Sequence, residues 1–339
     1  MKKIALLPGD GIGPDVTYEA VKVLKKVVPD FAYEEFSVGA EEFKKSGDPL
    51  PQSVFERLPE FDAILLGAMG LPNVRWPDGS EMTPQIDLRE RLDLYCGVRP
   101  IYLIEGSDSR LKNRKAGDID IVMFRESTEG LFSTRLNKLG ANVDQATDTM
   151  LITRKCAERI SRRAFELART RRKHVTLVDK ANVLPSMVFF RRVFDEVAAD
   201  FTDVRTDRVY VDAAALFLVE RPERFDVLVT ENMFGDILSD LGAGIIGGMG
   251  VAPSADLGDK YGIFQPSHGT APDIAGKGIA NPVATILSAA MMLDWLKVSG
   301  GETIRKAVYN VFKDPKARTR DMGGSMSTTE MGDAVSAAL

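Results

Sequence analysis

The 339-residue sequence contains only two histidines and two cysteines. His174 and His268 are too few to build a zinc site from histidine, so any bound metal has to be held by oxygen ligands. Cys96 and Cys156 lack the spacing of metal ligands and stand in apolar surroundings. This usage argues against a disulfide framework and favours a reducing compartment.

Long apolar runs and an excess of basic residues are also absent. The longest apolar candidate, ATILSAAMMLDWL, contains Asp294 and falls short of the roughly 20 residues of a membrane span. The chain opens on a strand-like run and not on a targeting segment, so we expect a cytoplasmic protein without a membrane partner. A net charge of −5 argues against a nucleic-acid partner. The one basic run, residues 169–174, is interpreted as the solvated end of a helix.

The segment PGDGIGPDV lacks the third glycine of a dinucleotide fingerprint. Pro14 stands where Gly-x-Gly-x-x-Gly needs the glycine that lets the helix pack closely against the strand. We therefore predict a strand over residues 3–7, a tight turn and a helix from Pro14, and we expect another element to bind any dinucleotide. Ala271 and Gly278 likewise break the phosphate-loop pattern around AGKG, which argues against an NTPase.

Strand-like and helix-like runs alternate along the chain. This pattern predicts an α/β protein with a large, mostly parallel sheet. The expected strands are DAILLGA, IDIVMFRES, HVTLVDK, RVYVDAAAL and FDVLVTENM, and the expected helices are TRKCAERISRRAFELART, PSMVFFRRVFDEVAAD and NPVATILSAAMMLDWLKV. Composition marks no domain boundary, but glycine- and proline-rich segments at 67–84 and 242–282 predict functional loops.

Acidic and basic residues follow several of the predicted strands. Asp236 and Asp240 stand four apart, which places both carboxylates on one helix face, where they suit Mg²⁺ or Mn²⁺ or simply complement the helix dipole. Asp212 is expected at the end of the run VYVDAAAL. Lys180 follows another strand, where it serves either as a general base or as a surface ion-pair residue.

Other candidates recognise anions or a nucleotide. Arg89, Arg99 and Arg125 have the planar forks that bind carboxylates. Asp273, in the loop PSHGTAPDIAGKGIANP, is placed to accept the ribose hydroxyls of an adenosine.

The order of these motifs resembles the isocitrate/isopropylmalate dehydrogenase family, the metal-dependent β-decarboxylating dehydrogenases, and most closely its 3-isopropylmalate branch. The resemblance covers essentially the whole chain and rests on PGDGIGPDV, VDKANVL, YVDAAA, TENMFGDILSD, HGTAPDIAGKGIANP and ILSAAMM. It implies a two-lobed α/β fold with a large, mostly parallel sheet, which is not a Rossmann fold. Residues 1–98 with 252–339 would form the cofactor lobe, and residues 99–251 would form the lobe for substrate, metal and dimerisation.

The resemblance also implies a homodimer that oxidatively decarboxylates a malate-type 2-hydroxy acid with NAD. Lys180 and Asp212 would be catalytic and would reach the partner's site, with the metal on Asp236, Asp240 and the partner's Asp212. The three arginines would bind substrate carboxylates. NAD would bind at Ile12, His268, Gly269, Thr270, Asp273, Ile274 and Asn281. Asp273 and Ile274 stand where NADP enzymes of the family carry basic or aromatic groups. A non-catalytic regulatory subunit is the alternative from another class.

Three positions depart from the branch it most resembles. Thr83 and Gln85 stand where isopropylmalate enzymes usually carry leucines, so D-malate, tartrate or isocitrate are alternative substrates unless Gln85 faces solvent and Ile86 fills the pocket. Phe132 replaces the usual tyrosine whose hydroxyl is thought to protonate the enol after CO₂ leaves. Decarboxylation is therefore expected to be slow or bypassed, unless Ser133, Thr134 or a water substitutes.

Overall fold

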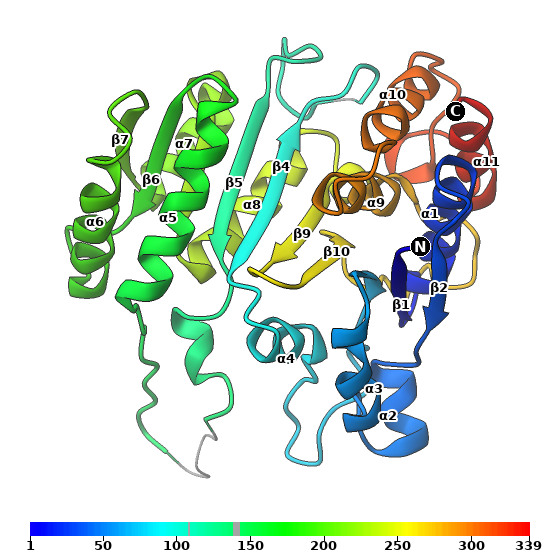
Figure 1. Cartoon of the computed structure of the whole chain (residues 1–339), viewed down its shortest axis with the longest axis horizontal. Helices are drawn as coiled ribbons and strands as arrows, with labels where there is room; N and C mark the ends of the chain where they lie inside the picture. The colour runs from blue at the N-terminus through cyan, green and yellow to red at the C-terminus, as the bar shows by residue number, and fades with distance from the viewer. Residues whose placement is uncertain (108, 138–142) are drawn as a thin grey trace. The chain divides into compact units, whose positions relative to one another are not determined.

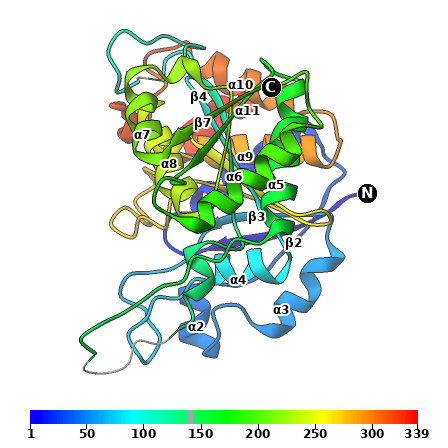
Figure 2. The ribbon, with the colours of Figure 1, turned by 90° about the vertical axis from the view of Figure 1, so that its left-hand side faces the viewer.

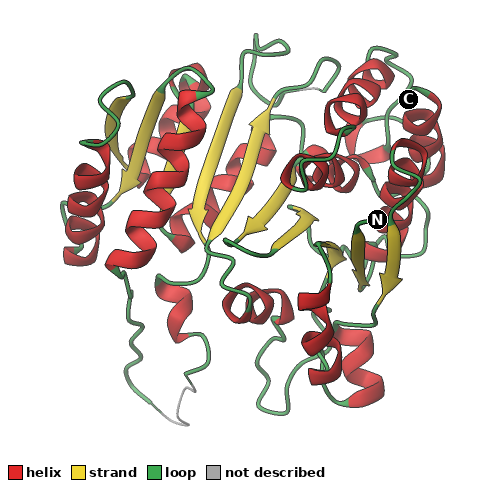
Figure 3. Cartoon of the chain, in the orientation of Figure 1, coloured by secondary structure: helices red, strands yellow, loops and turns green. Residues whose placement is uncertain are grey.

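The computed structural model describes residues 1–107, 109–137 and 143–339, and internal contacts divide the chain into two units. Unit 1 comprises residues 1–94, 102–117 and 243–339, and unit 2 comprises residues 95–101 and 118–242. Helices flank strands in each unit, which confirms the α/β prediction (Figure 3). No helix in these described ranges has both the length and the apolar character needed to cross a membrane.

The predicted lobe boundaries, near residues 98 and 251, stay a prediction, and the units differ from them in two segments. Residues 102–117 and 243–251 belong to unit 1. Contacts inside unit 1 explain this assignment. Ser109 Oγ donates to the carbonyl of Ile245 at 2.6 Å, and Tyr102 stacks on Tyr309 with ring centroids 5.7 Å apart.

Unit 1 has a stretch of sheet in the order β2-β1-β3-β10-β9, in which only β9 and β10 pair in antiparallel fashion. The strands are β1 Lys3–Gly9, β2 Ala32–Glu35, β3 Ala63–Ala68, β9 Pro253–Leu257 and β10 Gly262–Pro266. The helices are α1 Gly13–Val27, α2 Ala40–Ser46, α3 Gln52–Arg57, α4 Pro84–Arg91, α9 Val283–Trp295, α10 Gly301–Phe312 and α11 Thr328–Ala337. The predicted buried helix is α9, which packs against β9, β10, α1 and α10 (Figure 1).

Unit 2 has strands in the order β4-β5-β8-β6-β7, and the last four of these run parallel. The strands are β4 Cys96–Tyr102, β5 Asp120–Glu126, β6 His174–Asp179, β7 Arg205–Tyr210 and β8 Val227–Thr230. The helices are α5 Arg154–Arg169, α6 Pro185–Ala198, α7 Val211–Glu220 and α8 Asn232–Ile245. Helices α5 and α6 cover one face of these strands, and α7 and α8 cover the other (Figures 1 and 2).

Two interpretations of local structure need correction in unit 2. The run RVYVDAAAL is a strand only to Tyr210, because α7 begins at Val211. Asp212 therefore lies in the first turn of α7, which follows directly on the carboxyl end of β7. The basic run does join α5 to β6, but it is not simply solvated, because His174 is buried and Arg171 binds Asp120 and the buried Asp226.

The register of β6, β7 and β8 brings their ends level. Val178 of β6 pairs with Thr230 of β8, and Asp179 pairs with Tyr210 of β7. At the other end, His174 pairs with Arg205, the first residue of β7. Polar residues that follow or precede these strands are thus gathered at two opposite edges of unit 2.

Candidate active site

The carboxyl-terminal edge of unit 2 holds the acids and the lysine predicted to be functional. Lys180 follows β6, Asp212 follows β7, and α8 with Asp236 and Asp240 follows β8. Open parallel sheets bind ligands at this edge, where loops and the first turns of helices follow the carboxyl ends of the strands.

Arg125, near the end of β5, is fixed against α8. Its Nε and Nη2 donate to Oδ1 of Asn232 at 3.0 and 2.8 Å, and its Nη1 donates to the carboxylate of Asp236. A Cβ at Gly235 would lie 2.7 Å from Cβ and Cγ of Arg125, so glycine is required for this close approach. The Arg125 side chain is 3% exposed, and the acceptors of its guanidinium include a neutral amide oxygen and a charged carboxylate.

Asp236 and Asp240 lie one turn apart on α8. Desolvation and the negative charge of Asp236 raise the pKa of Asp240, while the charges of Arg125 and Arg99 oppose this shift. A divalent cation would relieve the repulsion, and hard carboxylate oxygens are the donors that Mg²⁺ and Mn²⁺ prefer. The residue types therefore fit such a metal.

One chain supplies only part of such a metal site. Among the described residues no group of three or more histidine, cysteine, aspartate or glutamate side chains is close enough to hold a metal ion. Asp236 and Asp240 thus leave coordination positions for water, substrate or a ligand from elsewhere.

Lys180 and Asp212 form a pair at the same edge. Lys180 Nζ donates to Oδ1 of Asp212 at 2.5 Å, and this bond lowers the pKa of Asp212. The preceding Asp179 is buried and bound through both oxygens by Arg191 at 2.7 Å, which fixes the backbone from which Lys180 projects. The Asp212 side chain is 68% exposed, so the pair is open to a ligand or to another chain.

Large apolar side chains are exposed on the two helices that carry these acids. Leu216 and Val219 lie on α7, and Ile237 lies between the two acids of α8 with 60% of its surface exposed. Exposed apolar side chains beside functional residues are typical of a surface that another protein covers.

In unit 1, α4 carries Arg89 and the predicted specificity residues. Arg89 Nε donates to Oδ2 of the buried Asp256 at 2.9 Å, and Gln265 donates to the same oxygen at 2.6 Å. This bond leaves the Nη donors of Arg89 for an anion. The hydrogen bond to Oδ2 of Asp256 therefore fixes the orientation of the Arg89 guanidinium.

The two residues predicted to read the substrate's third substituent stand at the start of α4. Thr83 precedes the helix and makes no side-chain cap bond to it. The Gln85 oxygen Oε1 is buried with no hydrogen-bond partner in the described part of the chain. The Gln85 side chain is only partly exposed, with Oε1 shielded from solvent, and its role in reading the substrate stays a prediction.

The glycine turn of unit 1 supports the predicted cofactor loop. Gly11 has φ +61°, and a Cβ there would lie 2.0 Å from the carbonyl oxygen of Thr270. The same carbonyl accepts a 2.9 Å hydrogen bond from the Ile12 amide. Ile12 and Ile274 also share a small apolar cluster, so three of the predicted cofactor residues lie together.

The remaining cofactor candidates occupy the same loop or its end. His268 Nδ1 lies 2.9 Å from the carbonyl of Gly269, and burial lowers the pKa of this histidine. Its Nε2 is a buried acceptor without a partner among the described residues, and an NH or OH donor of a nucleotide would satisfy it. Asp273 is exposed on this loop, while Asn281 Oδ1 accepts from the amide of Val283 at the start of α9.

Phe132 lies in a short 3₁₀ helix, Leu131–Thr134, with its ring centroid 5.4 Å from the guanidinium carbon of Arg125. The neighbouring hydroxyls are engaged, because Ser133 donates to the carbonyl of Gly130 at 2.8 Å and Thr134 to that of Leu131 at 3.0 Å. To replace a tyrosine as proton donor, either hydroxyl would have to give up a backbone bond.

The sequence reasoning missed Asn232 and Asp256, which orient Arg125 and Arg89. For Asn232 a signal was present, since residues 232, 236 and 240 follow one helix face at intervals of four. For Asp256 nothing local gave one, because it lies 167 positions from the arginine that it binds.

Comparison with known proteins identifies the relatives of this chain. The family model "Isocitrate/isopropylmalate dehydrogenase" matches residues 3–335. The chain is 43% identical to a 3-isopropylmalate dehydrogenase of Corynebacterium efficiens, over 99% of both chains, and 44% identical to one of Thermotoga maritima, over 98% of both. The crystal structure of isocitrate dehydrogenase from Methylococcus capsulatus is similar with a TM-score of 0.92 and 37% identity, covering 100% of this chain and 99% of that one.

Proposed function

The chain belongs to the isocitrate/isopropylmalate dehydrogenase family and is an oxidoreductase, and from this premise we propose that it oxidatively decarboxylates a malate-type 2-hydroxy acid of the 3-isopropylmalate kind, with NAD and Mg²⁺ or Mn²⁺. The observation that carries this proposal is the arrangement on α8. There Asp236 and Asp240 offer a divalent cation two carboxylates, and Asn232 fixes Arg125 beside them.

Side chains of the protein bind the substrate and move its proton. Arg99 and Arg125 in unit 2 and Arg89 in unit 1 bind carboxylates through guanidinium donors. Lys180 Nζ accepts the proton of the 2-hydroxyl, and its hydrogen bond to Asp212 orients it. When bound, NAD accepts the hydride and the cation stabilises negative charge on the 2-oxygen.

The loop after β10 suits NAD better than NADP. Thr270 and Ile274 lie against Ile12. Nε2 of His268 has no hydrogen-bond partner among the described residues, so it can accept a hydrogen bond from the nucleotide. The exposed Asp273 on that loop would accept ribose hydroxyls and repel a 2′-phosphate.

The incomplete set of carboxylates supports a homodimer that shares its sites. Asp212 is exposed on α7 and apolar side chains are exposed on α7 and α8, so a second copy of the chain would cover these helices and add its Asp212 and Lys180. Mixing two inactive variants, Lys180→Met and Asp236→Asn, would then restore about a quarter of the wild-type activity through hybrid dimers. Two variants that stay inactive after mixing would mean that each chain supplies its own lysine.

The activity itself is tested by following NADH and CO₂ from purified protein with Mn²⁺ and 3-isopropylmalate. We expect EDTA to abolish the reaction and NADP to give a lower kcat/KM than NAD. Full activity in excess EDTA contradicts the metal, and a higher kcat/KM with NADP contradicts the dinucleotide preference.

A second candidate substrate has a polar third substituent. The unsatisfied Gln85 Oε1 favours a substrate that brings a hydroxyl donor, such as tartrate, over one that brings an isopropyl group. Comparing kcat/KM for 3-isopropylmalate, isocitrate, D-malate and tartrate distinguishes these acids. A clear preference for 3-isopropylmalate rules out a polar role for Gln85.

A further inference from the structure

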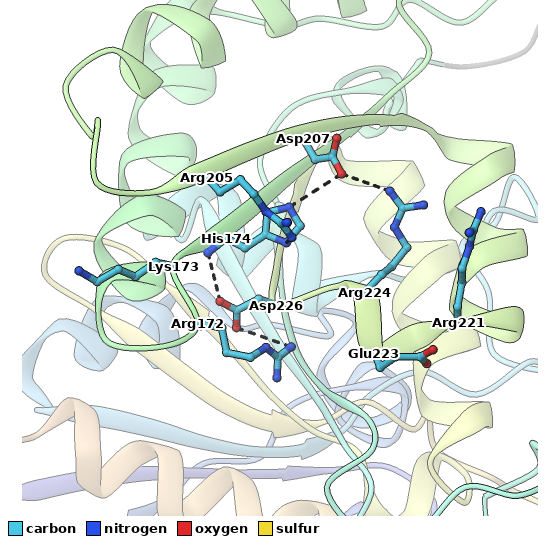
Figure 4. A pocket seen from close by; sticks show the side chains of 9 residues that line it. All are labelled: Arg172, Lys173, His174, Arg205, Asp207, Arg221, Glu223, Arg224 and Asp226. Atoms are coloured by element: carbon cyan, nitrogen blue, oxygen red, sulfur yellow. Dashed lines mark hydrogen bonds and ion pairs between the residues drawn. The ribbon is translucent and has the colours of Figure 1, made fainter.

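A cavity of about 750 Å³ opens at the amino-terminal edge of unit 2, away from the acids of α7 and α8 (Figure 4). It is formed where β6, β7 and β8 begin and includes residues of the basic run that precedes β6. At about 3.3 Å per residue, the two ends of β6 lie roughly 17 Å apart. The cavity is therefore separate from the site at the carboxyl ends of the same strands.

Cationic groups outnumber carboxylates in its lining, with five arginine and lysine side chains against three acids. Two of the acids are already neutralised. Asp226 is bound by Nε of Arg171 at 2.8 Å, and Asp207 by Nη2 of Arg224 at 3.2 Å.

Two guanidiniums on this cavity have no acid partner. In the described part of the chain, no carboxylate lies within 4.0 Å of Arg205 or Arg221. Arg205 Nη2 instead donates to Nδ1 of His174 at 2.9 Å, and Arg221 lies over the ring of Phe217, 4.3 Å from its centroid. Most of their donors therefore stay available in a chain whose net charge is −5.

His174 adds a third donor to this pair. A guanidinium can only donate, so Nδ1 of His174 is the acceptor and its Nε2 carries the proton. The ring is buried, and Nε2 makes only long contacts, at 3.5 Å to Oγ1 of Thr176 and at 3.9 Å to the nearest oxygen of Asp207, so a closer acceptor would bind its hydrogen more strongly. Figure 4 shows the Arg205 side chain lying across the His174 ring, with Arg224 on the other side of Asp207.

We propose that this cavity is a second binding site, which takes a small polyanion with phosphate or carboxylate groups through Arg205, Arg221 and Nε2 of His174. The volume admits a small metabolite, and unpaired guanidiniums bind phosphate and carboxylate oxygens in the same forked geometry. The site takes no part in the proposed oxidation, because none of its residues stands at the carboxyl ends of the strands.

The test is calorimetric titration of the full-length protein with pyrophosphate and, separately, with citrate at low salt. We expect saturable binding of at least one of them, weakened at least about tenfold by Arg205→Gln with Arg221→Gln and by raised NaCl. Arg192→Gln is the matched control, since Arg192 is an exposed arginine of unit 2 that also lies over a phenylalanine ring but lines no part of the cavity.

Pyrophosphate binding with none of citrate would assign the site to phosphates, and the reverse would assign it to carboxylates. Either result supports the proposal if the double variant weakens it. Failure of both probes to bind, or binding that the double variant leaves unchanged, overturns the proposal. NADH formation by the double variant at the wild-type rate would show that it is folded and that the two edges act separately.

Discussion

At their carboxyl ends, β6, β7 and β8 are followed by Lys180, Asp212 and the acids of α8, whereas their amino ends are flanked by His174, Arg205 and Asp226. Carboxylates at the amino ends are neutralised, as Asp226 is by Arg171. At the carboxyl ends Asp236 is paired with Arg125 and Asp212 with Lys180, but desolvation and the negative charge of Asp236 raise the pKa of Asp240. Between the two edges β6 and β8 are buried throughout, whereas most residues of β7 are exposed or half-buried. The buried strand interiors thus stabilise the fold. The perturbed carboxylate of Asp240 indicates that a ligand binds at the carboxyl edge.

The largest effect expected from this difference is that of Asp236→Asn. Removing a charge that holds the cation and Arg125 should lower kcat/KM for the hydroxy acid by about 10³-fold. Asp207→Asn, which removes a carboxylate from the amino edge, should change it by less than about twofold. NADH formation by both variants, with folding checked by circular dichroism, measures the contrast. Equal losses would contradict the separation of the two edges.

The next effect is that of the lysine after β6. Lys180→Met removes the proposed base and should lower kcat by about 10² to 10⁴-fold. Lys173→Met, just before the same strand, should leave kcat within about twofold, because Lys173 only approaches Asp203 at 3.8 Å. Steady-state kinetics at saturating substrate decide between these outcomes, and a Lys180→Met enzyme with near-normal kcat would exclude this lysine as the base.

Phe132→Tyr tests whether a hydroxyl at this position of the carboxyl edge assists the release of CO₂. The ring beside Arg125 is kept while a hydroxyl is added, so the substitution should speed release of CO₂ relative to NADH by about 10²-fold. Both products are followed in one reaction. Equal amounts of CO₂ and NADH from the native protein, with no gain in the variant, would mean that phenylalanine is a neutral replacement here.

The smallest predicted effect concerns stability. Burial raises the pKa of Glu126, at the end of β5, to about 7, against the hydrogen bonds that Thr128 and the Glu129 amide donate to it. The folded protein therefore binds this proton more tightly than the unfolded chain does. Its stability falls as pH rises from about 4.5 to about 7, and the full penalty is present above that range.

Glu126→Gln should remove that penalty. Relative to the native protein, the variant should gain up to about 3 kcal/mol in the free energy of unfolding between pH 4 and pH 8. Urea denaturation at both pH values measures the gain. The exposed Glu166→Gln should show no such trend, and a Glu126→Gln difference that is constant with pH would contradict the buried titration.

The alternation of apolar strands and amphipathic helices could be predicted because the hydrophobic periodicity of each element is a local property of the sequence. β3, β5, β6, α5, α6 and α9 lie where the pattern predicts them, within a few residues. The boundary between β7 and α7 was misplaced, since the apolar run VYVDAAAL satisfies either conformation. Only tertiary packing determines where the strand ends and the helix begins in such a run.

The sequence by itself determined the α/β class, the i,i+4 spacing of Asp236 and Asp240, and the loss of the hydroxyl at Phe132, because spacing and residue type are local properties. Tertiary structure alone decided that Asn232 and Asp256 orient the arginines, that Gln85 Oε1 is buried without a partner, and that the basic run lines a cavity. These features depend on strand register and on contacts between residues far apart in the chain. A short stretch of sequence does not encode such contacts, since they arise only when the strands align.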